Sequence, residues 1–249
     1  MYDINFFSYA WDKNNSFKYQ SFIIPYILFA LSTNKNSHVE IIIPNVNEFE
    51  EKYKNELVLL KNFNSNFLIR KSKYEVNKNT LNTYRFFEIP VIKSKFTYIT
   101  DIDIMFLEEV LPIYLNSWPN NLSYHNIIRP DQPRLSGVHM VYSDKYYTKN
   151  FEQCQKIYYN KNESDNDEKI LYYMCKEIHG LPDKNFNFRP ILGIHFSPNR
   201  GPGKKMHLKT NKKYYEIFSG IQKKYPDLFK MPIFKELVDQ LNNDFLIVH

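Results

Sequence analysis

The sequence predicts an α/β fold with a mainly parallel central sheet, flanking helices and a short helical C-terminal extension. Three observations predict it: strand-like and helix-like segments alternate along the N-terminal part, 43% of the 249 residues are hydrophobic, and no low-complexity block divides the chain. Such alternation is typical of parallel strands joined by crossover helices. The twenty Phe and twenty Tyr residues can fill a large core, so a disordered chain is excluded.

The expected strands are short segments rich in β-branched and aromatic residues. A proline closes the second of them, and the fourth runs directly into two aspartates. The expected strands are residues 4–9, 39–44, 67–70, 96–100, 138–142 and 191–196.

The expected helices carry apolar residues at helical spacing. Pro25 is tolerated only near the first turn of its helix, and Gly180 is a natural stop for the helix before it. The expected helices are residues 19–32, 46–62, 80–90, 167–178, 214–224 and 233–241.

Glycine is scarce, with six in the chain and none before Gly137. A usual frequency of about 7% would give about 17. A Walker P-loop or a dinucleotide-binding G-x-G-x-x-G turn needs glycine so that the backbone can approach phosphate. The first 136 residues therefore contain neither, and a nucleotide must be bound in another way.

The formal net charge of +6 is concentrated near the C-terminus, where six basic residues and no acidic one lie between Arg200 and Lys213. An anionic partner is expected to meet that part. Cys154 and Cys175 are expected to be buried free thiols rather than a metal or disulfide framework. Because no apolar stretch approaches the roughly 20 residues of a membrane span and the first residues do not resemble a signal peptide, we expect a cytoplasmic protein.

Two carboxylates, Asp101 and Asp103, end an apolar strand. Like charges in a mostly apolar setting are costly, and a divalent cation removes that cost. Carboxylate oxygens suit Mg²⁺ or Mn²⁺. Since parallel strands gather their carboxyl ends at one ligand-binding edge, the loop after Tyr9 is expected beside this pair. The alternative is two solvated aspartates at a strand end.

Several further motifs accompany the Asp pair in a definite order: Tyr9-Ala10-Trp11-Asp12, Tyr84-Arg85-Phe86-Phe87, Ser136-Gly137-Val138, Asp167-Glu168, Leu181-Pro182 through Asn187, and His195 followed by Gly201, Gly203 and Lys204. In this order they resemble the GT-A fold glycosyltransferases over residues 4–206, and most closely the family 8-like, retaining nucleotide-sugar transferases. Two departures stand out: Lys204-Lys205-Met206 replaces Lys-Pro-Trp, and Asp167-Glu168 replaces Asp-Gln. The latter also resembles the acceptor-activating pair of inverting enzymes, so the stereochemistry stays open.

The resemblance implies roles for named residues. Asp101, Asp103 and His195 would hold Mn²⁺ or Mg²⁺, while Asp167, Glu168 and Arg85 would act in catalysis. The implied donor-binding residues are Tyr9, Ala10, Asp12, Arg85, Ile102, Ser136, Gly137, Arg200, Gly203 and Lys204, with Lys205 beside the last. Each has a plainer alternative, such as a helix start for Asp167 and Glu168 or a solvated loop for the basic run. His125, His139 and His179 show no ligand spacing and are interpreted as structural.

The resemblance also implies an activity: metal-dependent transfer of a sugar from a nucleotide sugar, typically a UDP-sugar, to a glycan or lipid-linked glycan acceptor in surface polysaccharide synthesis. Residues 1–206 would form the catalytic domain, with a donor half of about residues 1–110 and an acceptor half of about residues 111–206. Residues 207–249 would form a helical extension packed on this domain. Peripheral contact with an anionic membrane is a hypothesis that rests on the basic C-terminal charge.

Two other classes of protein remain as alternatives. A haloacid-dehalogenase-like phosphatase also places Asp-x-Asp after an apolar strand, although near its N-terminus and with Thr or Val two residues on, whereas Asp103 is followed by Ile104 and Met105. A basic, aromatic-rich nucleic-acid-binding protein would also carry a positive charge excess. Here the basic residues are confined to one short segment and the aromatic ones follow apolar segments, which favours core packing.

Overall fold

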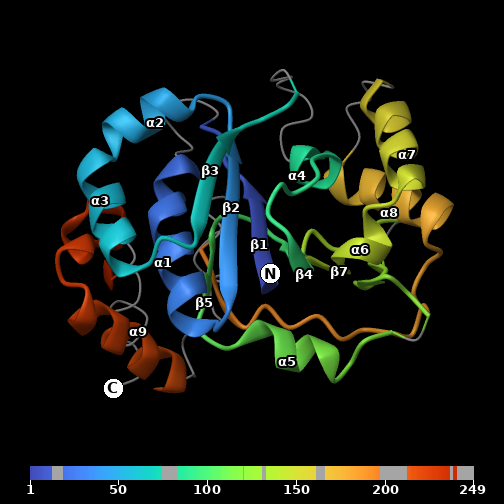
Figure 1. The fold of residues 1–249 in the computed structure, drawn as a ribbon. Helices are drawn as coiled ribbons and strands as arrows, with labels where there is room; N and C mark the ends of the chain where they lie inside the picture. The colour runs from blue at the N-terminus through green and yellow to red at the C-terminus, as the bar shows by residue number, and fades with distance from the viewer. Residues whose placement is uncertain are drawn as a thin grey trace.

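The structure is a computed structural model that describes residues 1–12, 19–74, 83–119, 121–130, 133–160, 166–196, 212–235 and 238–239. A central sheet runs through the molecule, and helices cover both of its faces (Figure 1). The predicted α/β class with a mainly parallel sheet is therefore confirmed.

The central sheet has six strands in the order β3-β2-β1-β4-β7-β6. The first four pair in parallel, whereas β7 runs antiparallel to β4, and β6 antiparallel to β7. Five predicted strands lie in this sheet, and β6 was not predicted. The strands are β1 (Tyr2–Tyr9), β2 (Ser37–Ile43), β3 (Phe67–Lys71), β4 (Ser94–Ile99), β6 (Tyr124–His125) and β7 (His139–Tyr142).

A second, two-stranded sheet pairs β5 (Ile104–Phe106) with β8 (Gly193–His195) in antiparallel fashion. Gly193 makes this pairing possible, because a Cβ there would lie 2.0 Å from the carbonyl oxygen of Met105. The scarce glycine is required here for contact between two strands rather than for contact with a ligand.

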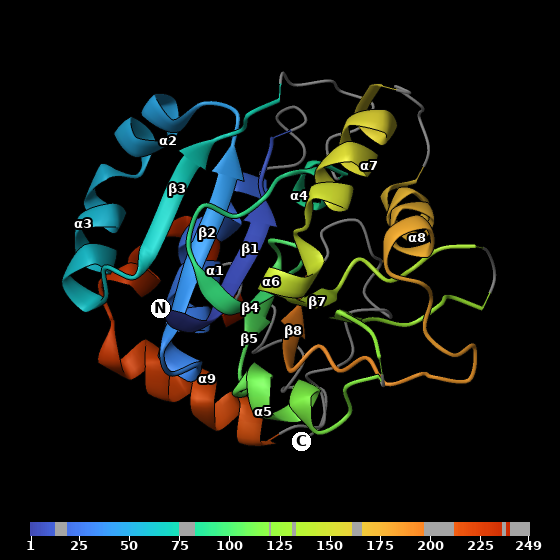
Figure 2. The ribbon, with the colours of Figure 1, turned by 45° about the vertical axis from the view of Figure 1, so that its right-hand side comes forward.

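Side chains alternate between two hydrophobic clusters because successive strand residues point to opposite faces. Phe6 belongs to the first cluster with Phe29 and Phe218, whereas Phe7 belongs to the second with Leu171. Helices α1, α3 and α9 therefore cover one face, and α4, α7 and α8 the other (Figure 2). The helices are α1 (Ile23–Thr33), α2 (Val46–Lys52), α3 (Lys54–Phe63), α4 (Tyr84–Phe87), α5 (Val110–Leu115), α6 (Ser143–Tyr146), α7 (Lys149–Asn160), α8 (Asp167–Ile178) and α9 (Lys212–Lys224).

One helix prediction is confirmed in its bounds, the predicted helices 19–32 and 214–224 are observed with shifted bounds as α1 and α9, and two predictions need correction. Helix α8 matches its prediction, and Gly180 takes the positive φ of 78° that favours glycine after a helix. The predicted helix 46–62 is interrupted at Tyr53. The predicted helix 80–90 extends too far, because α4 ends at Phe87; Pro90 disfavours a helical Ile89, and Glu88 turns to other partners. Residues 75–82 lie outside the described part.

A buried ion network fixes the chain after α4. Glu40 and Glu88 are fully buried and both contact the Arg70 guanidinium at 2.7 Å. Glu40 also accepts hydrogen bonds from the backbone N–H groups of Val91 and Ile92. The segment that leads out of α4 is therefore tied to β2 and β3, and this limits where α4 can lie.

The two cysteines are buried free thiols on α7 and α8, as predicted. Among the described residues, no helix combines the length and the apolar character that crossing a bilayer would require.

Candidate functional site

The carboxyl ends of β1 and β4 lie side by side, as the sequence predicts. Thr100 donates its N–H to the carbonyl of Phe7 at 3.1 Å, and the hydroxyl of Ser8 donates to the carbonyl of Thr100 at 2.8 Å. The Tyr26 hydroxyl and the Thr100 hydroxyl share a hydrogen bond of 2.7 Å. These contacts hold the turn that begins at Asp101.

Pairing of β8 with β5 brings His195 to the two aspartates. Ile104 lies opposite His195 in the register, and Phe196 donates its N–H to the carbonyl of Asp103 at 2.9 Å. His195 Nε2 lies 3.1 Å from Asp103 Oδ1 and 3.9 Å from Asp101 Oδ2. One potential ligand atom from each of the three residues falls within 4.8 Å of the others. Two carboxylate oxygens and an imidazole nitrogen at this spacing fit a divalent cation such as Mn²⁺.

Arg85 is the buried cation of the site. Its Nη1 lies 2.6 Å from Asp101 Oδ1, and its Nη2 lies 3.0 Å from Asp167 Oδ2. Burial lowers the pKa of the guanidinium, but these two carboxylates outweigh it and raise the pKa above its usual value. Since Arg85 occupies Oδ1 of Asp101, Oδ2 is the oxygen that faces His195.

The pKa values of Asp101 and Asp167 are shifted in opposite directions. Burial raises the pKa of Asp101, but the charges of Arg85 and His195 outweigh it and hold that pKa below its ordinary value. Burial also raises the pKa of Asp167, and there it prevails over Arg85 because the Asp101 charge opposes ionisation as well. As the pH falls, Asp101 therefore keeps its negative charge longer than Asp167 does.

The start of α8 supplies both Asp167 and Glu168. The helix is capped by Asn166, whose side chain accepts the N–H of Glu168 at 2.9 Å. Glu168 Oε1 accepts the N–H of Gly137 at 2.9 Å, and its Oε2 lies 3.3 Å from Arg134 Nη1. The two acids therefore lie at a helix start, as the plainer interpretation has it, and both also contact residues from other segments.

Gly137 lies where the Arg85 side chain passes. A Cβ at Gly137 would be 2.9 Å from Arg85 Nη2, which is closer than side chains allow. A larger residue at this position would therefore shift the Arg85 guanidinium away from its contacts with Asp101 and Asp167. The motif Ser136-Gly137 and the motif around Arg85 thus meet in space.

Of the other sequence-predicted donor-binding residues, those at the ends of β1 and β4 and before β7 are described, and most of these are buried. Ala10, Ile102 and Ser136 are almost fully buried. The Tyr9 ring packs against Tyr84 at a centroid distance of 5.3 Å, and its buried hydroxyl has no hydrogen-bond partner within the described segments. Asp12 Oδ1 accepts the N–H of Gln20 at 2.8 Å. Arg200, Gly201, Gly203, Lys204 and Lys205 lie outside the described residues.

Three arginines near Glu168 were not predicted from the sequence. Arg134 forms the ion pair described above, and the charges of Arg129 and Glu168 both act on the pKa of Arg189. A usable signal was present: Arg134 stands two positions before Ser136, and Arg189 stands in an otherwise apolar and aromatic run.

The histidines interpreted as structural are all buried or partly buried and hydrogen-bonded. His125 contacts Ser117, His139 contacts Asn126, and His179 contacts Ser123. None of the three belongs to the one metal-ligand group found among the described residues.

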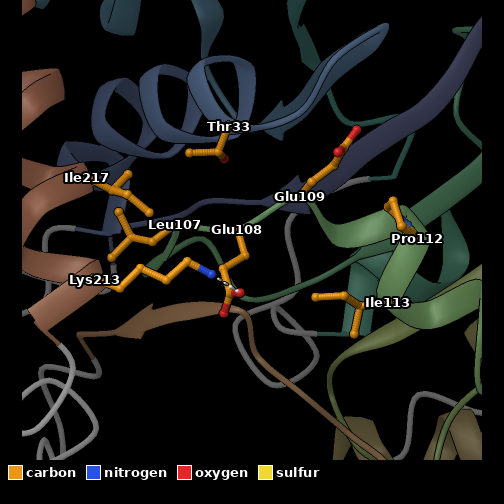
Figure 3. A pocket seen from close by; sticks show the side chains of 8 residues that line it. All are labelled: Thr33, Leu107, Glu108, Glu109, Pro112, Ile113, Lys213 and Ile217. Carbon is orange, nitrogen blue, oxygen red and sulfur yellow. Dashed lines mark hydrogen bonds and ion pairs between the residues drawn. The ribbon is translucent and has the colours of Figure 1, made fainter.

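A separate pocket of about 470 Å³ lies between α5 and α9, and these helices lie at the opposite end of the sheet from α4 (Figures 2 and 3). Glu108 points across this pocket to Lys213, at 2.7 Å, and also accepts the Tyr214 hydroxyl at 2.5 Å. Burial raises the pKa of Glu108, but these two hydrogen bonds outweigh it and lower that pKa. The pair anchors α9 and does not contribute to the site.

Comparison with solved structures identifies the fold. The apo form of the glycosyltransferase GlyE from Streptococcus pneumoniae TIGR4 matches 94% of this chain, with a TM-score of 0.52 and 12% identity. A second GlyE structure matches 72% of the chain, with a TM-score of 0.50 and 11% identity. The chain spans about half the length of GlyE, at 52% and 44% of the two structures. No protein-family model matches the chain, and no curated protein sequence does either. The chain thus has a GT-A-like glycosyltransferase fold.

Proposed function

We propose that this protein is a metal-dependent glycosyltransferase of the hexosyltransferase type, which moves a sugar from a nucleotide-sugar donor to a glycan or lipid-linked glycan. The observation that carries the proposal is the group of Asp101, Asp103 and His195 at the carboxyl edge of the sheet, on a fold shared with a glycosyltransferase. A UDP-sugar is the proposed donor. The proposed setting is surface polysaccharide synthesis at the cytoplasmic face of a membrane.

The proposed metal ligands are Asp101 Oδ2, Asp103 Oδ1 and His195 Nε2, whose mutual distances support such a site. Bound Mn²⁺ or Mg²⁺ would neutralise the donor diphosphate and so improve the nucleoside diphosphate as a leaving group. Arg200, Gly203 and Lys204 are proposed to bind the same phosphates.

Arg85 is proposed to orient the acids of the site and to contact the donor sugar. Its two ion pairs hold Asp101 beside Asp167, so that the donor edge and the start of α8 keep a fixed separation. Asp167 and Glu168 are proposed to contact the donor sugar or the acceptor hydroxyl. The proposed enzyme is family 8-like and retains the anomeric configuration of the donor sugar in the product.

The remaining proposed donor contacts come from the ends of β1 and β4 and from the turn before β7. Tyr9, Ala10 and Asp12 would lie at the nucleotide base, while Ile102, Ser136 and Gly137 would line the path of the sugar. The buried Tyr9 hydroxyl, which has no partner among described residues, supports this placement because a buried hydroxyl is costly when it is unpaired.

The test is a thermal-shift and turnover screen of UDP-, GDP- and CDP-sugars with and without Mn²⁺. We expect a response to at least one nucleotide sugar that requires the metal. Asp103→Asn and His195→Gln should each weaken Mn²⁺ binding by at least about tenfold. The matched control is Asp144→Asn, because Asp144 is an exposed aspartate on α6.

Two results would refute the proposal: no metal-dependent response to any nucleotide sugar, or full activity in Asp103→Asn. Metal-dependent hydrolysis of a phosphate monoester without sugar transfer would favour the phosphatase alternative instead. The anomeric configuration of the product decides between a retaining and an inverting reaction.

A further inference from the structure

Two short segments bring additional arginines to the start of α8. Ile128 and Leu135 form an antiparallel bridge, and Arg129 donates its N–H to the carbonyl of Arg134 at 2.8 Å. Leu135 in turn donates its N–H to the carbonyl of Glu168 at 3.0 Å. Arg129 and Arg134 therefore stand on two chain segments that are held together and against α8.

Arg189 reaches the same region from the segment that leads into β8. The next carbonyl along, that of Pro190, accepts the hydroxyl of Tyr114 at 2.7 Å. The preceding ring, Phe188, packs edge-on against Tyr114 and His125. These contacts fix the backbone on both sides of Arg189, so its position does not depend on an ion pair.

Only one of the three guanidinium groups is neutralised by an observed contact. Arg134 pairs with Glu168, whose other oxygen is taken by the Gly137 N–H. Neither Arg129 nor Arg189 forms an ion pair with any described residue, although both are partly buried. The Arg129 Nε is fully buried and lacks a hydrogen-bond partner within the described part of the chain.

The charges of these arginines act on one another. Burial and the nearby Arg129 charge both lower the pKa of Arg189, while Glu168 and, more weakly, Asp101 raise it. Two partly buried cations that repel each other are unfavourable unless an anion lies between them. Guanidinium groups match the geometry of phosphate oxygens and bind them in a bidentate way.

We propose that Arg129 and Arg189 bind a phosphoryl group carried by the acceptor, beside Glu168. This inference rests on the proposed glycosyltransferase function, because it assigns a chemical class to the acceptor of the same site. Two positive charges that form no ion pair with a described residue match a phosphate monoester, which carries about −1.5 to −2 at neutral pH, better than a single carboxylate.

The positions of the two arginines favour the acceptor over the donor. The proposed diphosphate site lies at Asp101, Asp103 and His195, whereas the segments that carry Arg129 and Arg134 are held against the start of α8 by the Leu135 N–H and the Glu168 carbonyl. The phosphoryl group would therefore lie on the α8 side of the site.

The first experiment measures the binding of inorganic phosphate to the full chain by calorimetry, with UDP and Mn²⁺ saturating the donor site. Arg129→Gln and Arg189→Gln should each weaken phosphate binding by at least tenfold, or about 1.4 kcal/mol. Lys184→Gln is the matched control, because Lys184 is an exposed cation near Arg189 in the chain and should leave phosphate binding unchanged. Arg129→Lys should bind phosphate more tightly than Arg129→Gln but less tightly than the wild type, because lysine keeps the charge and lacks the bidentate guanidinium.

Folding of each variant is checked by its thermal transition. Equal phosphate affinity in the wild type and in both folded Gln variants would overturn the proposal. Complete displacement of phosphate by UDP and Mn²⁺ would overturn it as well, because the phosphate would then occupy the donor site.

The second experiment separates the two sources of the phosphoryl group. Methyl phosphate represents a phosphorylated soluble glycan, and phosphatidylcholine vesicles that contain phosphatidic acid represent a lipid-linked phosphate. Binding that depends on Arg129 and Arg189 to either probe supports the proposal, and the probe identifies the source. The proposal is overturned if neither probe binds in a way that depends on Arg129 and Arg189.

Neither experiment requires sugar transfer, so the two proposals can fail separately. If phosphate binding depends on the two arginines but no nucleotide sugar is turned over, the phosphoryl site is supported and the glycosyltransferase function is refuted. If nucleotide-sugar turnover requires the metal but phosphate binding is the same without either arginine, the glycosyltransferase function is supported and the phosphoryl site is refuted.

Discussion

Arg85 and Asp101 form an ion pair of 2.6 Å between Nη1 and Oδ1, in which the arginine is almost fully buried. The same guanidinium reaches Asp167 with its other terminal nitrogen. One side chain on α4 therefore joins the end of β4 to the start of α8.

Replacement of Arg85 by Met should destabilise the protein by about 2–4 kcal/mol, because it leaves two partly buried carboxylates close together without a cation. The measurement is urea denaturation. Arg85→Lys keeps the charge but cannot reach both acids, so its loss should be smaller. In a double-mutant cycle, Arg85→Met and Asp101→Asn should show a clear coupling energy; strictly additive losses would contradict the ion pair.

Gly193→Ala should disrupt the pairing of β5 with β8, since the added Cβ would meet the Met105 carbonyl at 2.0 Å. We expect a loss of about 2–3 kcal/mol together with weaker Mn²⁺ binding, because His195 would move away from Asp103. Gly220→Ala on α9 is the matched control: a Cβ there has no neighbour within 4 Å, and the substitution should stabilise the helix by about 0.5–1 kcal/mol. Equal effects of the two substitutions would rule out this explanation.

Arg70→Met should cost about 3–5 kcal/mol, because Glu40 and Glu88 would remain buried without their cation. Its thermal transition should fall accordingly. Adding Glu40→Gln and Glu88→Gln should recover part of the loss, since two buried charges are then removed. If the triple variant were less stable than Arg70→Met alone, hydrogen bonding to the backbone rather than charge would be the main contribution of Glu40 and Glu88.

Stability should also fall in mild acid because of buried histidine. Burial lowers the pKa of His125 from 6.5 to about 4. Between these values the unfolded chain binds the proton and the folded chain does not, so acid favours unfolding by up to about 1.4 kcal/mol per pH unit. His125→Gln should flatten the loss of stability between pH 6.5 and pH 4, as measured by urea denaturation at several pH values. A slope that the substitution leaves unchanged would contradict this assignment.

The sequence predicted the parallel strands because their signal is local. Buried β-branched runs such as residues 39–43 show their structure in a few consecutive residues. The Asp pair could be placed at the sheet edge for the same reason, because parallel strands gather their carboxyl ends together.

The sequence did not predict the contacts of Arg129, Arg134 and Arg189. Their neighbours are decided by the bridge between Ile128 and Leu135 and by the seating of that bridge on α8. Such contacts join segments far apart in the chain, and no local pattern records them. The predicted helix 80–90 extended too far for a related reason. Glu88 forms an ion pair with Arg70, and the spacing of apolar residues along a helix does not reveal such a distant contact.

The pairing of β5 with β8 joins Asp103 to Phe196 across more than 90 positions of the chain. Closing so long a loop costs conformational entropy that must be recovered by the contacts it permits. Asp101 and Asp103 therefore meet His195 only when β8 pairs with β5, and a nascent chain that does not yet include β8 has the two aspartates without the imidazole. A metal ion bound by all three side chains would stabilise this pairing, so metal loading would have to wait until β8 has been synthesised and has paired with β5.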